Sequence, residues 1–429
     1  MSVSERRVVI TGVGLVTPLG IGAADFWSAL VAGRSAVTRE NLVDAEAEPR
    51  HLVARVPDLE IRAFVSNRKL LRIMCEGDRY ALAAAQMAVT DGGEDIPPPE
   101  RRGAFVGTRK ELAPYEMVRE PILASLDEEG HLSSRRLGEH GFPEIPPLAL
   151  VAGMPNGCLF ALSLLHSIKG SGANLIGSGD IGLAAIGAAY RAIRAGQVEW
   201  ALAGAHDAGV NRWDYADFHA LGLLSTRTGD PSQTVKPFDR HRDGFVLGEG
   251  AAVIVLEELS SALARGAQVL AEISGHAETC DAVGLLQLQP DGGALARGIE
   301  TAIGQAGLAP EDVDYVNACG TATLVGDRTE ARALSKVFGG RRRGPLVSGI
   351  KGGIGHLLAA SGAVEFGATV LALQHQIAPP TLNLNEPEPK CALEFVSRRA
   401  RKADIETAIT ISRGIGGQNA VTVLRRWES

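Results

Sequence analysis

The chain has 429 residues, of which 45% are hydrophobic and 22% are charged, which is the composition of an ordinary globular protein. Its 43 Lys and Arg residues against 50 Asp and Glu residues give a net charge of −7, and this balance argues against a nucleic-acid partner. The five cysteines are scattered without a Cys-x-x-Cys spacing, so the sequence predicts no metal site, no redox motif and no cofactor.

The N-terminal stretch "RRVVITGVGLVTPLG" is a strand-length apolar run without a small-residue cleavage pattern, so we expect no signal peptide. The most apolar region, residues 147–165, is interrupted by Pro155 and Asn156. It falls short of the ~20 residues that a membrane-spanning helix needs. The sequence therefore predicts a cytoplasmic protein without a membrane partner.

Strand-like runs rich in Val and Ile alternate with helical patterns rich in Ala and Leu, which predicts an α/β fold. The predicted strands lie at 6–14, 251–258, 409–417 and 420–426, and the clearest predicted helices at 78–93 and 292–313. The segment 109–147 is the most charged and is marked by prolines. We interpret it as a surface excursion, and a loop that contacts a partner or covers a pocket is the alternative.

The stretch "GANLIGSGDIGLAAIGAAYRAIRAG" at 172–196 predicts a strand that breaks at glycines and turns into a helix. The turn offers Ser178, Gly179 and Asp180 at a helix N-terminus, where negative charge is favoured. Residues 353–376 repeat this pattern of a glycine-rich break and a small-residue helix. The repeat predicts two similar α/β halves, residues 1–260 and 261–429, with a helical and loop insert from about 55 to 150 in the first.

Three further glycine-framed stretches, at 317–330, 348–362 and 412–419, carry polar or reactive groups. The last of them could supply backbone N–H groups to an oxyanion. Taken alone, Lys351 and His356 are more typical of structural residues than of catalysts. No stretch has the G-x-x-x-x-G-K-[ST] pattern, and Asp180 would repel a phosphate, so we exclude nucleotide binding.

In order and spacing, five stretches resemble those of the β-ketoacyl-acyl carrier protein synthase family of thiolase-like condensing enzymes. They are "RRVVITGVGLVTPLG", "KPFDRHRDGFVLGEGAAVIVLEELSSALARGA", "GLAPEDVDYVNACGTAT", "IKGGIGHLLAASGA" and "SRGIGGQNA". The resemblance implies a thiolase-type fold, with two similar α/β halves in a five-layer αβαβα sandwich. It also implies a dimer formed by pairing of a central strand, and a substrate held by the phosphopantetheine of an acyl carrier protein.

The family uses a cysteine at the elbow, a histidine in a His-Gly-Thr-x-Thr stretch, and a second histidine five residues after a lysine. A thiolate accepts the acyl chain there, and imidazole N–H groups stabilise the enolate left by decarboxylation. Here the cysteine position holds Gly179 and the first histidine position holds Cys319, whereas Lys351 and His356 match. No intact catalytic set remains.

Three positions near this set carry further expectations. Ser178 is one residue from the cysteine position, and we do not expect it to substitute, because the turn fixes which side chain enters the site. Glu330 matches the acidic residue that would form a structural ion pair with Lys351, and Ile415 lies where the family has a bulky gating aromatic. Cys319 is interpreted as a buried, inert thiol, with a relocated nucleophile as the alternative.

The resemblance is greatest to a chain-length-factor (KSβ) subunit, which pairs with an active ketosynthase and shapes the tunnel for the growing chain. This interpretation predicts a subunit that is inactive alone, in a heterodimer of a type II polyketide or fatty-acid-like synthase, with a homodimer left open. The predicted tunnel and interface residues, for which plain core packing is the alternative, are Cys158, Leu159, Phe160, Leu164 and Ile415.

Two enzymatic alternatives remain open. One is a malonyl-acyl carrier protein decarboxylase that makes a primer, in which His356 and the backbone near Gly417 stabilise the enolate. Loss of one polarising group argues against it, since such a loss costs ~10²–10³ in rate. The other is an altered acyltransferase that uses Cys319.

Overall fold

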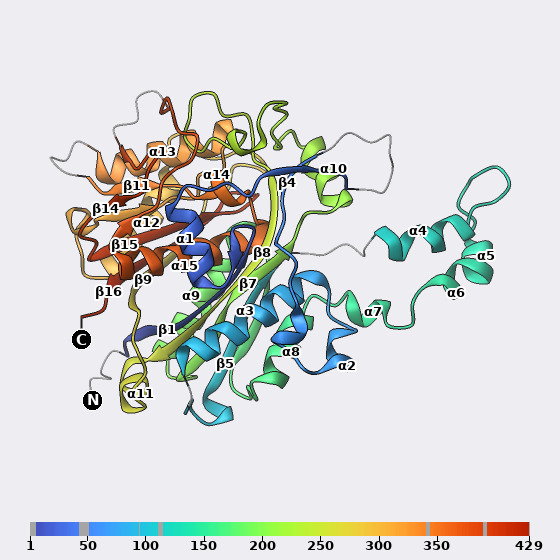
Figure 1. Ribbon diagram of the computed structural model, residues 1–429, viewed down its shortest axis with the longest axis horizontal. Coiled ribbons are helices and arrows are strands. Elements are labelled where there is room, and N and C mark those ends of the chain that lie inside the picture. Colours follow the sequence, from blue (N-terminus) through green and yellow to red (C-terminus); the bar gives the residue numbers. More distant parts are fainter. Residues whose placement is uncertain are drawn as a thin grey trace.

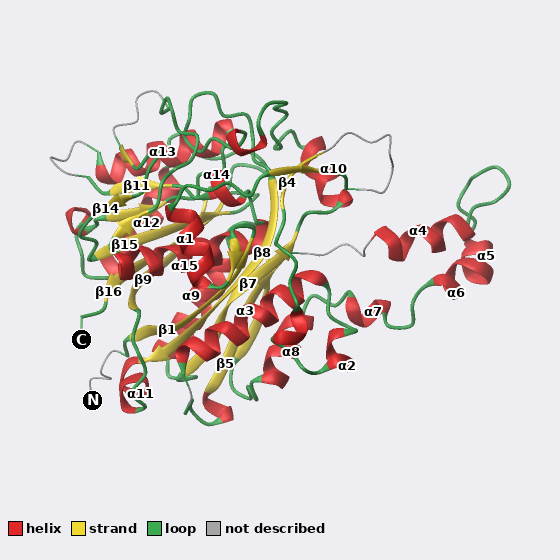
Figure 2. Cartoon of the chain, in the orientation of Figure 1, coloured by secondary structure: helices red, strands yellow, loops and turns green. Residues whose placement is uncertain are grey.

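The computed structural model describes residues 6–42, 51–93, 95–109, 115–339, 344–388 and 393–428. Strands and helices alternate along the chain, as the sequence predicts (Figures 1 and 2). The longer strands are β1 (Val8–Thr17), β5 (Arg102–Thr108), β6 (Gly172–Ile176), β7 (Trp200–Ala208), β8 (Leu247–Glu258), β9 (Ala271–Cys280), β15 (Thr407–Arg413) and β16 (Gln418–Arg426). The short strands are β2 (Gly20–Ile21), β3 (Thr38–Glu40), β4 (His51–Ala54), β10 (Tyr315–Asn317), β11 (Leu346–Ser348), β12 (Ile377–Ala378), β13 (Glu394–Phe395) and β14 (Arg401–Lys402).

The α-helices follow the same alternation. The longer ones are α1 (Ala23–Val31), α3 (Glu76–Gly92), α4 (Tyr115–Ala124), α8 (Gly157–Leu165), α9 (Ile181–Arg194), α10 (Arg212–Ala220), α12 (Gly293–Gln305), α13 (Leu324–Phe338) and α15 (Ser361–His375). The short ones are α2 (Arg68–Leu71), α5 (Ser134–Arg136), α6 (Phe142–Glu144), α7 (Ala149–Ala152), α11 (Leu259–Ala264) and α14 (Lys351–Ile354).

The strand order is the same in the two halves of the chain. The N-terminal half runs β6-β5-β7-β8-β1 and the C-terminal half runs β11-β10-β15-β16-β9. In each half the first three strands are parallel, and the last two join by antiparallel pairing. A short antiparallel contact between β1 and β9 connects the halves into one mixed sheet. The repeat seen in the sequence is thus a repeat of topology, while the boundary at residue 260 stays a prediction.

Helices cover both faces of these strands and also separate them, which produces the predicted five layers. Helices α9 and α15 pack against each other in the middle, α9 on β5 and β7 and α15 on β15. Helix α3 covers β1 and β8 on one outer face, and α12 covers β9 and β16 on the other. The middle helices are the two small-residue helices of the sequence repeat, and both are almost entirely buried.

Such close packing of helices on strands depends on glycine and other small residues at the contacts. Strand β1 is buried along its whole length, so its residues show no alternation of apolar and polar character. A Cβ atom at Gly14 would lie only 1.7 Å from the carbonyl oxygen of Ala84 in α3. The glycines of β1 and the alanines of α3 therefore allow the helix to lie directly against the strand.

The charged, proline-marked segment forms an arm. Its helices α4 to α6 project away from the layered body (Figure 1). Several of its large apolar side chains are exposed, and they include Ile122, Leu132 and Phe142. The predicted surface excursion matches this placement, although residues 110–114 of that segment lie outside the described residues. Among the residues described, no helix is long and apolar enough to cross a membrane.

Candidate active site

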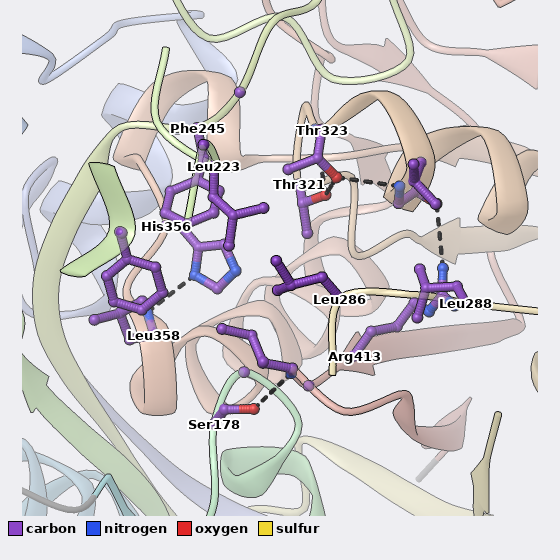
Figure 3. Close-up of a pocket in the computed structure, with 18 of the residues that line it drawn as sticks. Ser178, Leu223, Phe245, Leu286, Leu288, Thr321, Thr323, His356, Leu358 and Arg413 are labelled. Atoms are coloured by element: carbon purple, nitrogen blue, oxygen red, sulfur yellow. Dashed lines mark hydrogen bonds between the residues drawn. The ribbon is translucent and has the colours of Figure 1, made fainter. Parts of the chain in front are cut away.

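A pocket of about 400 Å³ opens where the elbow before α9 meets the loop after β15. Its walls are mainly apolar and include Phe218, Leu223, Phe245, Leu286, Leu288, Leu324 and Leu358. Ser178, Gly179, Thr321, Thr323, His356, Arg413 and Ile415 also line it (Figure 3). The structure therefore brings all four glycine-framed stretches of the sequence together around one cavity.

The elbow itself is built as the sequence predicts. Strand β6 ends at Ile176 and α9 begins at Ile181, so Ser178, Gly179 and Asp180 form the turn between them. The carbonyl oxygen of Gly179 accepts a hydrogen bond of 2.6 Å from Ser412 Oγ. Residue 179 thus lies against the end of β15, at the floor of the pocket, and offers no nucleophile.

Other atoms fill the space that a side chain at position 179 would need. An ideal Cβ atom there would lie 2.4 Å from the carbonyl oxygen of Arg413 and 3.4 Å from Cε1 of His356. A real Cβ atom essentially never lies within 3.0 Å of another heavy atom. Because the close contact is with backbone, a cysteine could enter only if the chain at Arg413 moved.

Arg413 is held from several sides, although sequence reasoning did not identify it. Its guanidinium donates to Asn419 Oδ1 at 2.8 Å, to Thr329 Oγ1 at 2.9 Å and to Asp281 Oδ2 at 3.2 Å. The side chain is buried, so these bonds are needed to offset its desolvation. An arginine between Ser412 and Gly414, at the end of a buried strand, is the signal that marks this position in the sequence.

The neighbouring hydroxyl is already engaged. Ser178 Oγ accepts a hydrogen bond of 2.8 Å from the backbone N–H of Ile415 (Figure 3). It lies 3.4 Å from Asp180 Oδ1, a separation at the long limit for a hydrogen bond. Burial raises the pKa of the Asp180 carboxyl. Ser178 therefore lacks the short hydrogen bond to a strong base that an activated serine has.

From the sequence we expect the loop at 414–417 to donate N–H groups to an oxyanion, but these groups form hydrogen bonds within the protein. The N–H of Gly414 bonds to Gln418 O and that of Gly416 to Leu285 O, both at 2.8 Å. The N–H of Gly417 bonds to Gly414 O at 3.3 Å, and that of Ile415 bonds to Ser178. An oxyanion in the pocket could use this loop only after one of these bonds was broken.

His356 is placed where the resemblance predicts. Its Nδ1 accepts the backbone N–H of Leu358 at 3.0 Å and lies 3.2 Å from Ser361 Oγ. The ring proton therefore resides on Nε2. Burial, with a smaller contribution from the Lys351 charge, lowers the pKa of His356 well below its usual value. The site thus has one neutral imidazole in contact with the pocket, adjacent to Gly179.

Cys319 does not replace the missing nucleophile. It follows β10 and is buried, with 1% of its surface exposed. Its N–H donates to Glu330 Oε1 at 2.8 Å and its carbonyl accepts from Lys351 Nζ at 2.7 Å. Burial raises the pKa of the thiol, so it stays protonated at neutral pH. It is absent from the described residues that line the pocket, and this geometry fits the inert thiol.

The sequence predicts that Lys351 forms an ion pair with Glu330, but in the structure its acidic partner is a different residue. Lys351 Nζ instead forms its salt bridge with the Glu365 carboxylate of α15, and both groups are buried. Glu330 on α13 accepts the backbone N–H groups of Cys319 and Gly320 at 2.8 and 2.9 Å. Both carboxylate oxygens of Glu330 therefore hold the loop. Glu365 could have been found in the sequence as a lone acidic residue within an apolar helix pattern.

The predicted tunnel residues of α8 lie elsewhere. Cys158 and Leu159 pack in a core cluster with α3 and β5, whereas Phe160 and Leu164 are about half exposed. Helix α8 lies on the outer face of the N-terminal strands, beside α3. None of its residues is among the described residues that line the pocket. The place of these four residues in a tunnel or interface shared with a partner subunit therefore stays a prediction. Ile415 does line the pocket.

A buried ion network that sequence reasoning also missed closes one side of the pocket. Arg109 donates to both oxygens of Asp207, at 3.0 and 3.1 Å, and to both oxygens of Asp214, at 2.6 and 2.7 Å. Its charge is therefore compensated within the protein. It fixes α10 against β7, and it does not present an unpaired cation to a ligand.

Two family models match the chain. The beta-ketoacyl synthase N-terminal domain matches residues 5–147 and 178–262, and the beta-ketoacyl synthase C-terminal domain matches residues 270–385. Among curated relatives, the chain is 34% identical to a 3-oxoacyl-[acyl-carrier-protein] synthase 2 of Synechocystis sp., over 100% of both chains. It is 35% identical to the tetracenomycin polyketide synthase ketoacyl synthase alpha subunit of Streptomyces glaucescens, over 99% of this chain and 98% of the relative.

Solved structures agree with these matches. The ishigamide ketosynthase/chain length factor superposes with a TM-score of 0.86 at 31% identity, covering 99% of this chain and 100% of the other. A type II PKS acyl-carrier protein in complex with its ketosynthase bound to the hexaketide gives a TM-score of 0.85 at 28% identity, with the same coverage. The similarity thus extends over both halves of the chain.

Proposed function

The chain belongs to the beta-ketoacyl synthase family, and on that premise we propose that it is a non-condensing subunit of a type II synthase. In this role it pairs with a cysteine-bearing ketosynthase. It contributes to the tunnel that holds an acyl or polyketide chain, while the chain stays attached to the carrier protein or to the partner.

The observation that carries the proposal is the closed position at residue 179. Condensation in this family starts with transfer of the acyl chain to a thiolate at the elbow. Here the residue is glycine, and the Arg413 carbonyl oxygen occupies the space of a Cβ atom at 2.4 Å. The chain lacks both the nucleophile and the room for one.

Neighbouring groups do not supply a replacement. Ser178 Oγ accepts a hydrogen bond from the Ile415 N–H. Its nearest carboxylate oxygen, Asp180 Oδ1, is 3.4 Å away, too far for a strong hydrogen bond to a base. The thiol of Cys319 is buried, and burial raises its pKa. These two observations argue against the altered acyltransferase, because a thiol needs a lowered pKa and access to the substrate in order to react.

The decarboxylase alternative has one observation in its favour. His356 keeps its Nε2 proton and its place beside the pocket, so it could donate to the carbonyl oxygen of a malonyl thioester. The N–H groups of residues 414–417 are bonded within the protein, and the first histidine position of the family holds Cys319. One donor remains where the family uses more, so we rank decarboxylation second.

Pairing with a partner is supported by the free edge of the sheet. In the described part of the chain, β6 is an end strand with one neighbour, β5, so its other edge has unpaired backbone groups. Ile176 at its end and Phe160 and Leu164 on α8 are exposed apolar residues. A partner strand added to β6 would cover these groups. The neighbour described as a ketosynthase/chain length factor supports such a pair.

Native mass spectrometry tests the proposal directly. The chain is co-expressed with a candidate cysteine-bearing ketosynthase and given the acyl-loaded carrier protein, and both stoichiometry and the site of the acyl mass are determined. We expect a 1:1 heterodimer that is acylated on the partner alone. As a control, a partner whose cysteine is changed to alanine should form the same heterodimer without any acyl mass.

Two results would contradict the proposal. One is a homodimer of this chain that does not bind the ketosynthase partner. The other is a mass increase on this chain that corresponds to a bound acyl group. Decarboxylation is measured separately, as acetyl-carrier protein formed from malonyl-carrier protein by this chain alone. If that activity exists and is lost in His356→Asn, the second candidate replaces the first.

A further inference from the structure

A second cluster of reactive side chains lies away from the pocket. Asp78 of α3, Cys158 of α8 and His206 of β7 meet beneath the outer helices of the N-terminal half. A carboxylate oxygen, the thiol sulfur and a ring nitrogen of these residues all lie within 4.8 Å of one another. All three residues are buried, and His206 is only 1% exposed.

His206 is the unusual member of the cluster. Neither of its ring nitrogens has a hydrogen-bond partner among the residues that the structure describes. Buried polar atoms in folded proteins are nearly always bonded, so an imidazole without a hydrogen-bond partner points to a ligand or ion that binds it. A Cβ atom at residue 77 would lie 2.7 Å from Nδ1 of His206, so the ring fits here only because Gly77 has no side chain.

The donor set matches a transition metal. Imidazole nitrogen, thiolate sulfur and carboxylate oxygen are the ligands that zinc takes in proteins. The distance from His206 Nε2 to Asp78 Oδ1 is 3.6 Å. A tetrahedral zinc site with bonds of about 2.0–2.3 Å places its ligand atoms about 3.3–3.8 Å apart. The other oxygen, Asp78 Oδ2, accepts the N–H of Cys75 at 3.2 Å, which orients the carboxylate from behind.

We propose that Asp78, Cys158 and His206 bind a divalent transition-metal ion of the zinc type. Binding would release the Cys158 thiol proton, since the thiolate is the ligand. A water molecule or a fourth side chain would complete the coordination. Because the ligands come from positions 78, 158 and 206, no spacing motif reveals the site, and the sequence-based expectation of a metal-free chain is the one that this proposal replaces.

The place of the site in the fold indicates a structural role. His206 faces α3, whereas the next residue, Asp207, faces the opposite side of β7 and bonds to Arg109 and to the N–H of Ala359. A metal at His206 would therefore hold α8, the helix that follows the projecting arm, to β7 and α3. It would not enter the pocket, so this inference is independent of the proposed function.

Metal analysis of the purified full-length chain is the test. Because the site is buried, the metal must enter as the chain folds, so the protein is expressed in medium supplemented with zinc and then dialysed against a chelator. Elemental analysis should find about one zinc ion per chain. It should find almost none in Cys158→Ser or His206→Gln, and an unchanged amount in Cys280→Ser, which changes an exposed thiol on β9.

Expression with cobalt provides a readout of the ligands. A tetrahedral cobalt site with a thiolate ligand has visible d–d bands and a near-ultraviolet sulfur-to-cobalt charge-transfer band. We expect both in the wild-type chain and in Cys280→Ser. Wild-type protein without metal, or with equal metal in Cys158→Ser, overturns the proposal, and so does cobalt without the charge-transfer band. The wild-type measurements need no variant, so they stand even if a ligand variant fails to fold.

Discussion

Placing a cysteine at position 179 is the most direct test of the proposal that the elbow has no room for a side chain. In Gly179→Cys, the new Cβ atom would lie 2.4 Å from the Arg413 carbonyl oxygen and 3.4 Å from His356 Cε1. The carbonyl cannot withdraw freely, because Ser412 Oγ bonds to Gly179 O and the Arg413 guanidinium is bonded to Asn419 and Thr329. We therefore expect lost stability and no recovery of condensation.

The magnitude follows from the cost of overpacking. Forcing extra atoms into a filled site costs about 1–3 kcal/mol. For a chain of 429 residues, the unfolding entropy per residue converts this into a fall in melting temperature of about 1–3 °C. Differential scanning calorimetry measures the change, and intact-protein mass spectrometry after incubation with acyl-carrier protein reports acylation.

Two glycine-to-alanine variants control for the effect of adding a side chain. Gly179→Ala adds the same Cβ atom without a thiol, so it should destabilise the chain as much as Gly179→Cys does. Gly304→Ala adds a Cβ atom on the exposed side of α12, where nothing lies within 4 Å. It should stabilise the chain by up to about 1 kcal/mol. A Gly179→Cys chain that melts like wild type and accepts an acyl group would refute the argument.

Three further predictions concern the buried charges of the site and its surroundings. Glu365→Gln removes the charge that compensates buried Lys351, and urea unfolding should show a loss of about 3–5 kcal/mol in stability. Glu330→Gln keeps one acceptor for the loop and should cost less. A larger loss in Glu330→Gln would show that Glu330 is the partner of Lys351. Burial raises the pKa of Glu249 to about 7, above its unfolded value of about 4.5, so its contribution to stability is full below pH 4.5 and is lost as the pH rises through 7. Glu249→Gln should therefore gain stability relative to wild type between pH 5 and pH 8, by about 2–3 kcal/mol, and an equal difference at both pH values would contradict this. Because burial keeps the pKa of His356 low, nitrogen-15 NMR should find it neutral, with the proton on Nε2, from pH 8 down to pH 5.5, whereas titration near pH 6.5 would show a solvated ring.

Patterns that are local in the sequence predicted the fold well. The glycine-broken strand and helix at 172–196 became β6, the elbow and α9, and the repeat at 353–376 became its counterpart α15. Apolar runs set the strands, and ordered glycines set the turns, because both effects act within a few residues. Four of the five ordered stretches contribute residues to the pocket.

Contacts between distant residues were the part that the sequence could not predict. The partner of Lys351 depends on how α14, α13 and α15 are oriented around it, and two buried acids, Glu330 and Glu365, compete for that role. The approach of the Arg413 carbonyl to Gly179 joins positions more than 200 residues apart. The helix α8 was assigned to a tunnel because its residues are apolar, but apolar character alone does not tell which face of a sheet a helix covers.

The retained residues of the site take on a different meaning once their bonds are known. Lys351 and His356 match the positions of the lysine and the second histidine of the family. Yet Lys351 compensates Glu365 and bonds to the Cys319 carbonyl, and His356 Nδ1 accepts the Leu358 N–H at the start of the central helical layer. Both residues therefore stabilise the fold whether or not a substrate reacts. Their presence therefore does not by itself indicate a catalytic role, and the packing of the Arg413 carbonyl against Gly179 is a further contact that holds this part of the fold.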